Sequence, residues 1–403
     1  MATRRILVSG AGIAGATVAY WLARSGFAVT LVELASGIRS SGAPVDIRGD
    51  ALSVVARMGV LDQLREAATT ARQTVIIDEH GSPLARLATQ NSVGRRSPST
   101  ASGPGALAEI ELARPDLARI MLATIADDTQ LIDRDSIRSL NEDHGGVDVS
   151  FDSGREDRFD LVIGADGVHS RTRSLLFGPE AGYALHLGLY IGGMPVGDLP
   201  DVPGDVLHYN LPGRSVTIHP ASGIPMIAFI FRSPALPDFD HRDLDQHRRM
   251  ILERYAHDRW RTPELLGYVR SAPDIYFDAV TRIALRSWSS GRVVLAGDAA
   301  SAVSLLGDGS TKAIIGAHTL AHELATTLDH TAAASSTSQF ASIAFRRYEH
   351  QHARRISPAW QVRATAGLLV PQTRTGIVVR NRLLRTATLL NRGLQSISRT
   401  PIN

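Results

Sequence analysis

The feature that most constrains the fold is a glycine turn, "GAGIAG", that directly follows an apolar, strand-like segment at 5–9. The helical pattern of 13–25 comes next, and the apolar segment 27–33 predicts a second strand. A strand, a helix and a second strand in this order form a βαβ unit, in which the two strands lie parallel in one sheet. The first part of the chain is therefore predicted to be an α/β, Rossmann-like domain.

Each glycine of this turn has its own physical role. Gly10 permits the tight turn, Gly12 lets a pyrophosphate approach the backbone beside Ala14, and Gly15 lets the helix pack closely on its strand. The unpaired N–H groups at the start of the helix attract phosphate. Glu33 ends the second strand, where a carboxylate can accept hydrogen bonds from ribose hydroxyls. These features predict a dinucleotide-binding site; the alternative is a tight βα turn followed by an incidental acid.

Two later segments end a buried strand on glycine and aspartate. The first, "GADG", carries Asp166, with Ser170 and Arg173 shortly after it. A cofactor contact is one interpretation of this segment, and an N-cap by Ser170 is the other. The second, "LAGD", places Asp298 at the end of strand 293–296. A buried carboxylate is costly unless it is hydrogen-bonded, so Asp298 indicates either a ligand or a helix cap.

A ligand of the size of FAD needs a turn for its pyrophosphate, an acid for its ribityl chain and donors for its flavin ring. Asp298 can accept hydrogen bonds from ribityl hydroxyls. Backbone N–H groups around Gly307, Gly309 and Ser310 open a predicted helix at 310–328. A helix N-terminus stabilises the negative charge of reduced flavin at its pyrimidine edge. We therefore expect FAD as the cofactor.

The three motifs, in this order and spacing, resemble those of the group A flavin-dependent monooxygenases, which share the para-hydroxybenzoate hydroxylase fold. The chain is most similar to the tetracycline-inactivating branch, to which segments 42–62 and 109–121 are also similar. The resemblance covers residues 4–330. It implies an oxidoreductase of secondary metabolism that binds FAD, meets NADPH or NADH transiently, and hydroxylates an aromatic or polyketide-like molecule or inserts oxygen into it.

The resemblance also implies roles for individual residues. No acid–base pair is identifiable, so the chemistry is expected to be that of the flavin. The implied positions are Gly10, Gly12, Gly15 and Glu33 for the ADP half, Arg114 for the FAD chain, Asp166 and Arg173 for FAD and NADPH, Asp298 for the ribityl chain, and Arg48 with the loop Leu306, Gly307, Asp308 and Gly309 near the flavin.

Three departures from the family pattern lie close to the expected flavin. Ser301 replaces a histidine, a proline is missing around 304–305, and Asp308 replaces a glutamine. A carboxylate at Asp308 would hinder flavin reduction; Lys312 could offset it, or could be an exposed surface lysine. Because the missing proline lies near the expected site of oxygen transfer, an alternative function is an FAD-containing natural-product cyclase or isomerase with a structural flavin. A flavin-binding module without turnover is a third.

The pattern of apolar, polar and turn-forming residues predicts the domain organisation of the chain. An FAD-binding domain is expected at 1–181, with small inserted strands at about 72–112, and it returns at 287–330. Alternating segments at 182–286 predict an antiparallel substrate domain, and 331–403 predicts C-terminal helices. Four side chains on the inserted sheet are candidate substrate contacts, with core packing as the alternative: His208, His219, Phe229 and Phe231.

Composition excludes several classes of protein. The 403 residues include no cysteine, which rules out disulfides, thiolate metal sites and a cysteine nucleophile, and we expect no metal. The pI of about 9.4 suggests nucleic acid, but aromatic content of 5% and the lack of a recognised module argue against it.

No apolar segment approaches the roughly 18 residues of a membrane span, and no signal peptide is apparent, so a cytoplasmic monomer or homodimer is expected. The arginine-rich segment 380–395 is amphipathic. It is predicted to pack as a terminal helix over the FAD domain, with an anionic membrane as the less favoured alternative.

Overall fold

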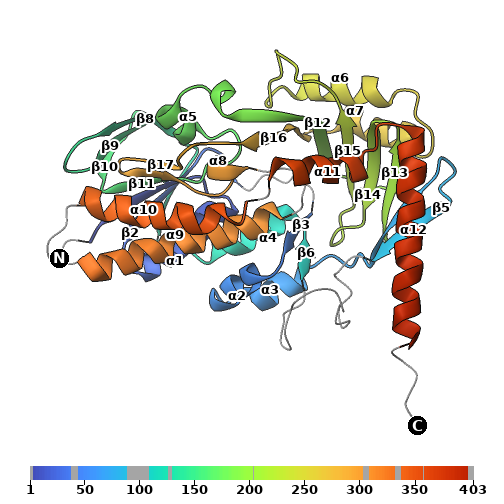
Figure 1. Cartoon of the computed structure of the whole chain (residues 1–403). Coiled ribbons are helices and arrows are strands. Elements are labelled where there is room, and N and C mark those ends of the chain that lie inside the picture. Colours follow the sequence, from blue (N-terminus) through green and yellow to red (C-terminus); the bar gives the residue numbers. More distant parts are fainter. Residues whose placement is uncertain are drawn as a thin grey trace, which may run out of the picture.

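The computed structural model describes residues 3–37, 44–88, 109–125, 129–202, 204–302, 308–331, 337–356 and 358–397. Two lobes lie side by side in Figure 1, one built on a parallel sheet and one on a largely antiparallel sheet. The predicted α/β architecture with an antiparallel second sheet and C-terminal helices is confirmed.

In the part of the chain that the structure describes, the parallel sheet has the strand order β17-β18-β11-β1-β2-β7. Its strands are β17 (Ser289–Ser290), β18 (Val293–Leu295), β11 (Leu161–Gly164), β1 (Arg5–Ser9), β2 (Ala28–Glu33) and β7 (Thr129–Asp133). Only β17 pairs antiparallel with its neighbour among these described strands. Three strands distant in sequence thus end at one sheet edge, which brings the glycine turn and both glycine–aspartate segments together.

Both faces of the parallel sheet are covered, as their alternating apolar residues require. Ile6 and Val8 of β1 face a core shared with helices, whereas Leu7 faces a core shared with a second layer of strands. The helices that surround the parallel sheet are α1 (Ile13–Arg24), α2 (Asp50–Arg57), α3 (Leu61–Glu66), α4 (Arg114–Ala123), α5 (Arg171–Phe177), α8 (Asp298–Ser301), α9 (Gly309–Thr331) and α10 (Thr337–Ala353). The layer of strands is β8 (Ile137–Glu142), β9 (Val147–Phe151) and β10 (Glu156–Phe159).

The second sheet has the order β16-β12-β15-β14-β13-β4-β5 among the described residues. Its strands are β16 (Tyr276–Ile283), β12 (Ala184–Pro195), β15 (Met226–Arg232), β14 (Arg214–His219), β13 (Val206–Leu211), β4 (Gln73–Ile77) and β5 (Pro83–Ala88). The prediction confined this sheet to 182–286, but β4 and β5 extend it, and β4 pairs parallel with β13. The physical reason is burial: Val75 and Ile77 pack with Tyr209.

Two helices cover the outer face of the second sheet: α6 (Leu244–Tyr255) and α7 (Thr262–Ser271). Tyr255 of α6 is fully buried, and its hydroxyl donates to the carbonyl oxygens of Ser215 and Ile230, each at 2.9 Å. This buried tyrosine holds α6 against one face of the second sheet. The other face of that sheet therefore faces the parallel lobe.

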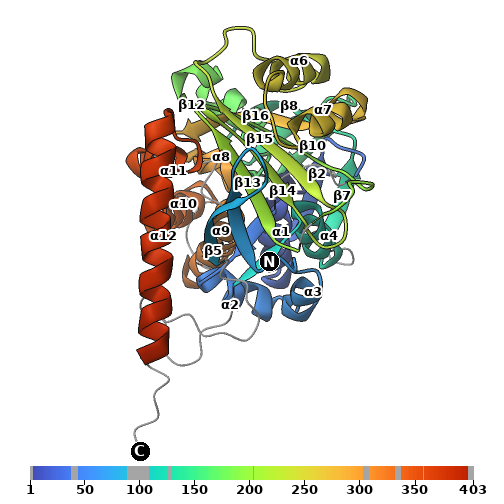
Figure 2. The same ribbon diagram turned by 90° about the vertical axis from the view of Figure 1, so that its right-hand side faces the viewer.

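The chain ends in α11 (Ala359–Leu369) and α12 (Arg374–Ile397). Figure 2 shows α12 along the edge of the second sheet, and its buried Arg380 donates to Leu368 O at 2.8 Å and Asn210 Oδ1 at 2.7 Å. The Arg385 guanidinium donates to the carbonyl oxygen of Leu84 in β5. Packing of the terminal helix is thus confirmed, but packing over the FAD domain is wrong, because its partners are β5 and β13. Among the described helices, none has the length and apolar character needed to cross a membrane.

A half-buried histidine links the two lobes. His169, in the loop before α5, places Nε2 3.0 Å from Oδ2 of Asp278 in β16 and Nδ1 3.6 Å from Glu180. Burial alone would lower the pKa of His169, but hydrogen bonds and charge from Asp278 and Glu180 outweigh it and raise the pKa to about 9. His241 stacks on the His169 ring at 3.7 Å, and burial and the nearby charge lower the pKa of His241. A charged His169 therefore joins the lobes at neutral pH.

This ion pair predicts a pH-dependent stability. Because the folded pKa of about 9 lies above the unfolded value of 6.5, the stabilisation is fully present below pH 6.5 and is lost as pH rises to about 9. We expect His169→Gln to lower the free energy of unfolding by about 2 kcal/mol at pH 6 and by much less at pH 9.5. Urea unfolding at both pH values measures this, with the exposed His80→Gln as control. Equal losses at both pH values would contradict it.

Candidate active site

The glycine turn has the backbone that a phosphate site requires. Gly10 has a φ of +99°, and a Cβ there would lie 2.5 Å from the carbonyl oxygen of Ala165. A Cβ on Gly15 would lie 1.8 Å from the carbonyl oxygen of Gly10. A Cβ on Gly12, the N-cap of α1, would meet no atom within 4 Å. Gly10 and Gly15 are thus required by the fold, whereas Gly12 leaves space open at the helix N-terminus.

Glu33 holds the glycine turn against the end of β2. Its carboxylate accepts a hydrogen bond from the backbone N–H of Ala11 at 2.7 Å and another from that of Ala35 at 2.9 Å. The acid therefore lies beside the turn, where ribose hydroxyls are expected in a dinucleotide site. Its role toward a cofactor stays a prediction.

The Asp166 segment is built as a structural loop. The carboxylate of Asp166 accepts from the hydroxyl of Ser170 at 2.5 Å and from N–H and hydroxyl of Thr172, both at 2.8 Å. Ser170 in turn caps α5 by accepting from the Arg173 N–H at 2.9 Å, so the N-cap interpretation is confirmed. Arg173 is fully buried and donates to the carbonyl oxygens of Val168 and Ala299. These residues fix the loop; contact with FAD or NADPH stays a prediction.

The glycine–aspartate segment that carries Asp298 meets the glycine turn directly. Gly297 has a φ of +59°, and a Cβ on it would lie 2.7 Å from the Cβ of Ala14 in α1. Asp298 begins α8 immediately afterwards and is half-buried. The first and the last motif, which are almost 290 residues apart, therefore share one edge of the parallel sheet.

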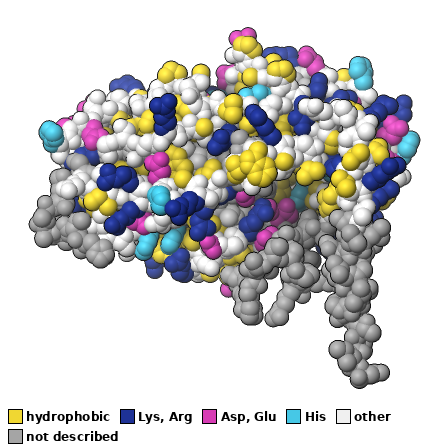
Figure 3. Space-filling view, viewed as in Figure 1, with side chains coloured by type: hydrophobic (Ala, Val, Ile, Leu, Met, Phe, Trp, Pro, Cys, Tyr) yellow, Lys and Arg dark blue, Asp and Glu magenta, His cyan; other side chains and the backbone are white. Residues whose placement is uncertain are grey.

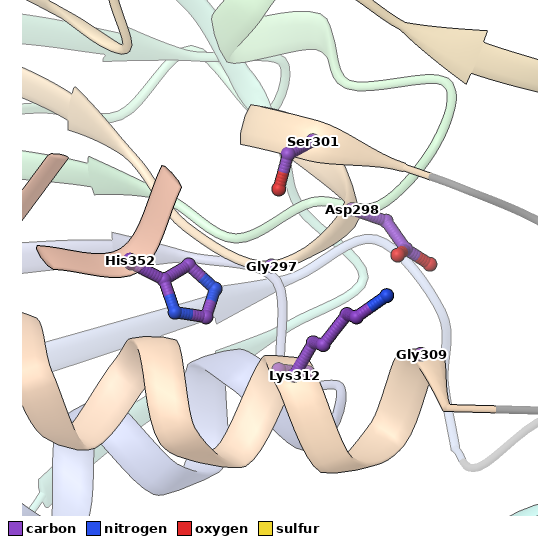
Figure 4. Close-up of a pocket in the computed structure, with 7 residues that line it drawn as sticks. Gly297, Asp298, Ser301, Gly309, Lys312 and His352 are labelled. Carbon is purple, nitrogen blue, oxygen red and sulfur yellow. The ribbon is translucent and has the colours of Figure 1, made fainter. Parts of the chain in front are cut away.

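A small cavity lies between α8, α9 and α10 (Figure 4). Its lining residues are Gly297, Asp298, Ser301, Gly309, Lys312, Ala313 and His352. In Figure 4 the Lys312 side chain extends from α9 toward Asp298, and the His352 ring points toward Gly297. Burial lowers the pKa of His352 to about 4, so this ring is neutral at physiological pH.

Lys312 is an internal cation and not the exposed surface lysine considered from the sequence. Its side chain is only 14% exposed, and its ammonium lies 2.7 Å from Asp308 Oδ2. The two residues are one helical turn apart at the start of α9, which makes the ion pair a local one. The charge of Asp308 is therefore compensated beside the helix N-terminus. Leu306 and Gly307, the other members of the predicted loop, lie outside the described residues, as does 304–305.

Strand β3 (Val45–Ile47) and Arg48, which follows it, are hydrogen-bonded to the start of α9. The Thr311 hydroxyl donates to the carbonyl oxygen of Asp46 at 2.9 Å, and the Arg48 N–H donates to the Thr311 hydroxyl at 3.1 Å. The Arg48 side chain pairs with Asp46 at 2.8 Å. Arg48 thus lies beside the start of α9, and Ser310 is buried in the same turn. Their proximity to a flavin stays a prediction.

Arg114 starts α4 and lies near Tyr276 of β16. Burial raises the pKa of Tyr276 to about 12, with contributions from the charges of Asp278 and Asp298, and the charge of Arg114 opposes them. The Tyr276 phenol is thus neutral and sits among charges that come from both lobes. Sequence reasoning did not find Tyr276, because a lone tyrosine in a strand gives no signal for such a position.

The four candidate substrate contacts separate onto different faces of the second sheet. Phe229 and Phe231 are corrected to core residues: each packs edge-on against Tyr255, with ring centroids 5.0 and 6.1 Å away. Strand alternation puts them under α6, away from the parallel lobe. His208 faces the other way but is buried against α11, with ring nitrogens 2.8 Å from Thr217 Oγ1 and 3.3 Å from Leu369 O.

His219 is the candidate that lies at the junction of the lobes. Its Nε2 is 3.4 Å from Oε2 of Glu111 in β6 (Ile110–Leu112), the partner strand of β3. Glu111 also accepts from the Thr69 hydroxyl at 2.8 Å. Sequence reasoning missed Glu111 and Asp46, although both lie in segments that it found similar to the family.

The donor set at this edge fits FAD. The open space at Gly12 and the α1 N-terminus suit a pyrophosphate, and Glu33 lies beside them. Asp298 and Lys312 line a small cavity beside the α9 N-terminus, where a carboxylate can accept hydrogen bonds from hydroxyl groups and the helix N-terminus favours negative charge. When bound there, FAD would supply the electron transfer and oxygen chemistry that these side chains cannot perform.

The chain matches the family FAD_binding_3, described as "FAD binding domain", over residues 3–350. A flavin-dependent monooxygenase from Legionella longbeachae serogroup 1 (strain NSW150) is 34% identical over 324 residues, which cover 79% of this chain and 80% of the relative. Crystal structures of the tetracycline destructases Tet(51) and Tet(55) are similar at TM-scores of 0.78 and 0.75, with 27% and 29% identity. These alignments cover 96% and 95% of both chains, respectively. The chain therefore belongs to the FAD-binding flavin-dependent monooxygenases.

Proposed function

We propose that this protein uses NAD(P)H and O₂ to oxygenate a planar aromatic or polyketide-like small molecule through bound FAD. The observation that supports this most is the convergence at one sheet edge of Gly12, Glu33, Asp298 and the α9 N-terminus. The relatives point the same way, since two of the similar crystal structures are those of tetracycline destructases. The substrate would enter between the lobes, against the sheet face that carries His219.

The residues of the site would act by binding and by electrostatics. Gly12 and the α1 N-terminus would hold the pyrophosphate, and Asp298 would accept hydrogen bonds from the ribityl chain. The α9 N-terminus, together with Lys312, would stabilise negative charge on the ring edge. Orientation of the substrate by the second sheet would supply the remainder of the catalytic effect.

A screen tests this function directly. The purified protein is expected to be yellow, and its NAD(P)H oxidation should speed up with phenols or polycyclic natural products that gain one oxygen by mass. Reduction of the flavin followed by admission of air should give product only when O₂ is present. Product formed anaerobically without NAD(P)H would instead support the cyclase or isomerase function, and a colourless protein that takes up no FAD would contradict both.

The Lys312–Asp308 pair predicts the rate of flavin reduction. In Lys312→Met the negative charge of Asp308 would be left uncompensated beside the α9 N-terminus, which disfavours a reduced, anionic flavin. We expect anaerobic reduction by NAD(P)H to slow by about tenfold, and Lys312→Arg to remain close to wild type. Stopped-flow absorbance of the flavin measures both. An unchanged rate in Lys312→Met would place the flavin elsewhere.

A further inference from the structure

Two carboxyl groups face each other beside the proposed flavin edge. Asp46 of β3 and Glu111 of β6 are directly opposite in the antiparallel register. Opposite side chains in such a pair have Cβ atoms about 5 Å apart, and like charges there destabilise the sheet. Burial raises the pKa of Asp46 to about 6; the charge of Arg48 opposes this, and Glu111 is among the carboxyls that add to it. The sheet thus carries a like-charged pair that a purely structural strand pairing would not favour.

His219 gives an independent indication of a ligand at this pair. Its Nδ1 accepts a hydrogen bond from the Ala221 N–H at 2.9 Å, so the neutral ring carries its proton on Nε2. The residue is 8% exposed, and Nε2 makes no hydrogen bond among the described residues, although it lies 3.4 Å from Glu111. A buried donor without an acceptor costs about 1–3 kcal/mol. A ligand oxygen placed at Glu111 would satisfy it.

The position of the pair connects it to the reaction site. The carbonyl oxygen of Asp46 accepts from Thr311 in the first turn of α9 at 2.9 Å. Figure 3 shows Asp and Glu side chains in a recess at the place that β3 and β6 occupy in Figure 1, below α11. His219 reaches the pair from the second sheet, so the three side chains span the junction where a substrate would lie.

We propose that Asp46 and Glu111 bind and deprotonate a phenolic or enolic hydroxyl group of the substrate, and that His219 Nε2–H donates to the same oxygen. This inference rests on the proposed function and names its substrate class. The O–H bond breaks, the proton passes to a carboxylate, and the electron pair stays on oxygen, where it raises electron density at the ring carbon to be oxygenated. The oxygen atom comes from O₂ and the reducing electrons from NAD(P)H, and the carboxyl proton returns to solvent.

The surroundings of the pair set its pH dependence. Below about pH 6 Asp46 holds a proton and cannot accept one from the substrate, so activity should fall on the acid side. Besides Glu111, the charged groups that act on Asp46 are Arg48 after β3, Glu109 before β6 and Asp308 before α9. Lys312 of α9 pairs with Asp308. On the side of His219, the Asp116 carboxylate of α4 lies 3.5 Å from the Ser222 hydroxyl after β14.

Binding of a probe pair tests the hydroxyl site without turnover. Calorimetry on the oxidised FAD-containing protein compares 1-naphthol with its methyl ether, 1-methoxynaphthalene. We expect wild type to prefer the naphthol at least tenfold. The preference should fall below about threefold in Glu111→Gln and His219→Leu, and His219→Gln, which keeps an N–H donor, should restore part of it. Equal affinity in wild type, no binding of either probe, or an unchanged preference in both variants would overturn the inference.

Turnover then tests proton transfer. With the hydroxylated compound that most stimulates NAD(P)H oxidation, kcat/KM in wild type should fall below about pH 6. In Asp46→Asn, kcat/KM should no longer fall at acid pH, and its value at the pH plateau should be about 100-fold lower than in wild type. Asp62→Asn serves as the matched control, because the Asp62 side chain is 89% exposed on α3.

FAD content and melting temperature report whether each variant folds. If Asp46→Asn does not fold, Glu111→Gln carries the test. If a folded Asp46→Asn protein kept the acid limb of the kcat/KM profile, deprotonation by Asp46 would be refuted. If wild type preferred the naphthol but formed no oxygenated product from any substrate, the proposed function would fail and the hydroxyl-binding site would stand.

Discussion

Gly12→Val should give a folded protein that has lost its yellow colour. Gly12 has an extended backbone with a φ of −72°, and no atom lies within 4 Å of an added Cβ, so the fold accommodates a side chain there. The open space is, however, where a pyrophosphate would contact the helix N–H groups. We expect FAD affinity to fall at least 100-fold, which is about 2.8 kcal/mol. Flavin absorbance after titration with FAD measures this.

The matched control is Gly197→Val, at an exposed glycine that also has open space around its Cβ and no positive φ. That variant should bind FAD as wild type does. Gly10→Ala supplies a second comparison, because a Cβ there meets the Ala165 carbonyl oxygen at 2.5 Å and should disrupt folding itself. A yellow Gly12→Val protein with wild-type affinity would remove the glycine turn from the cofactor site.

Arg173→Met should destabilise the protein by about 3–5 kcal/mol. The guanidinium is fully buried, donates to Val168 O at 2.5 Å and Ala299 O at 3.1 Å, and lies 3.5 Å from Glu180. Methionine of similar length fills the space, but the carbonyl oxygens of Val168 and Ala299 lose the donor that Arg173 supplies. Glu180 keeps His169 but loses Arg173 as a cationic neighbour. Urea unfolding of wild type and variant, both without FAD, measures the loss.

Arg171→Met is the control, because this arginine lies on the same helix and pairs with Asp152 at the surface, with both side chains more than 40% exposed. It should change the free energy of unfolding by less than about 1 kcal/mol. If Arg173→Met retained full stability but lost NAD(P)H oxidation, the arginine would belong to cofactor contact and not to the loop structure.

Motifs with strict backbone requirements were predictable from the sequence. The glycine turn, Glu33 and Asp298 follow buried strands, and a parallel sheet necessarily gathers such strand ends at one edge. Helix α9 was predicted to start at residue 310, one residue after its observed start. The signals here are local, because each depends on residues that are adjacent in the chain.

The failures concern contacts between distant segments. Alternation showed that Phe229 and Phe231 share one face of a strand, but not which face α6 covers. Lys312 is a local case: the sequence left open whether it offsets Asp308 or lies exposed at the surface, and helix α9 pairs it with Asp308. Asp46 and Glu111 carry no motif, and their pairing follows from the register of two three-residue strands.

The parallel pairing of β4 with β13 interlocks the two lobes. Residues 73–88 leave the parallel lobe early in the chain and complete a sheet whose other strands begin only at residue 184. Neither lobe is therefore a continuous stretch of chain, and cutting at the lobe junction would expose the hydrogen-bonding edge of β13. The lobe built on the second sheet can therefore be exchanged between related proteins only together with the β4–β5 hairpin.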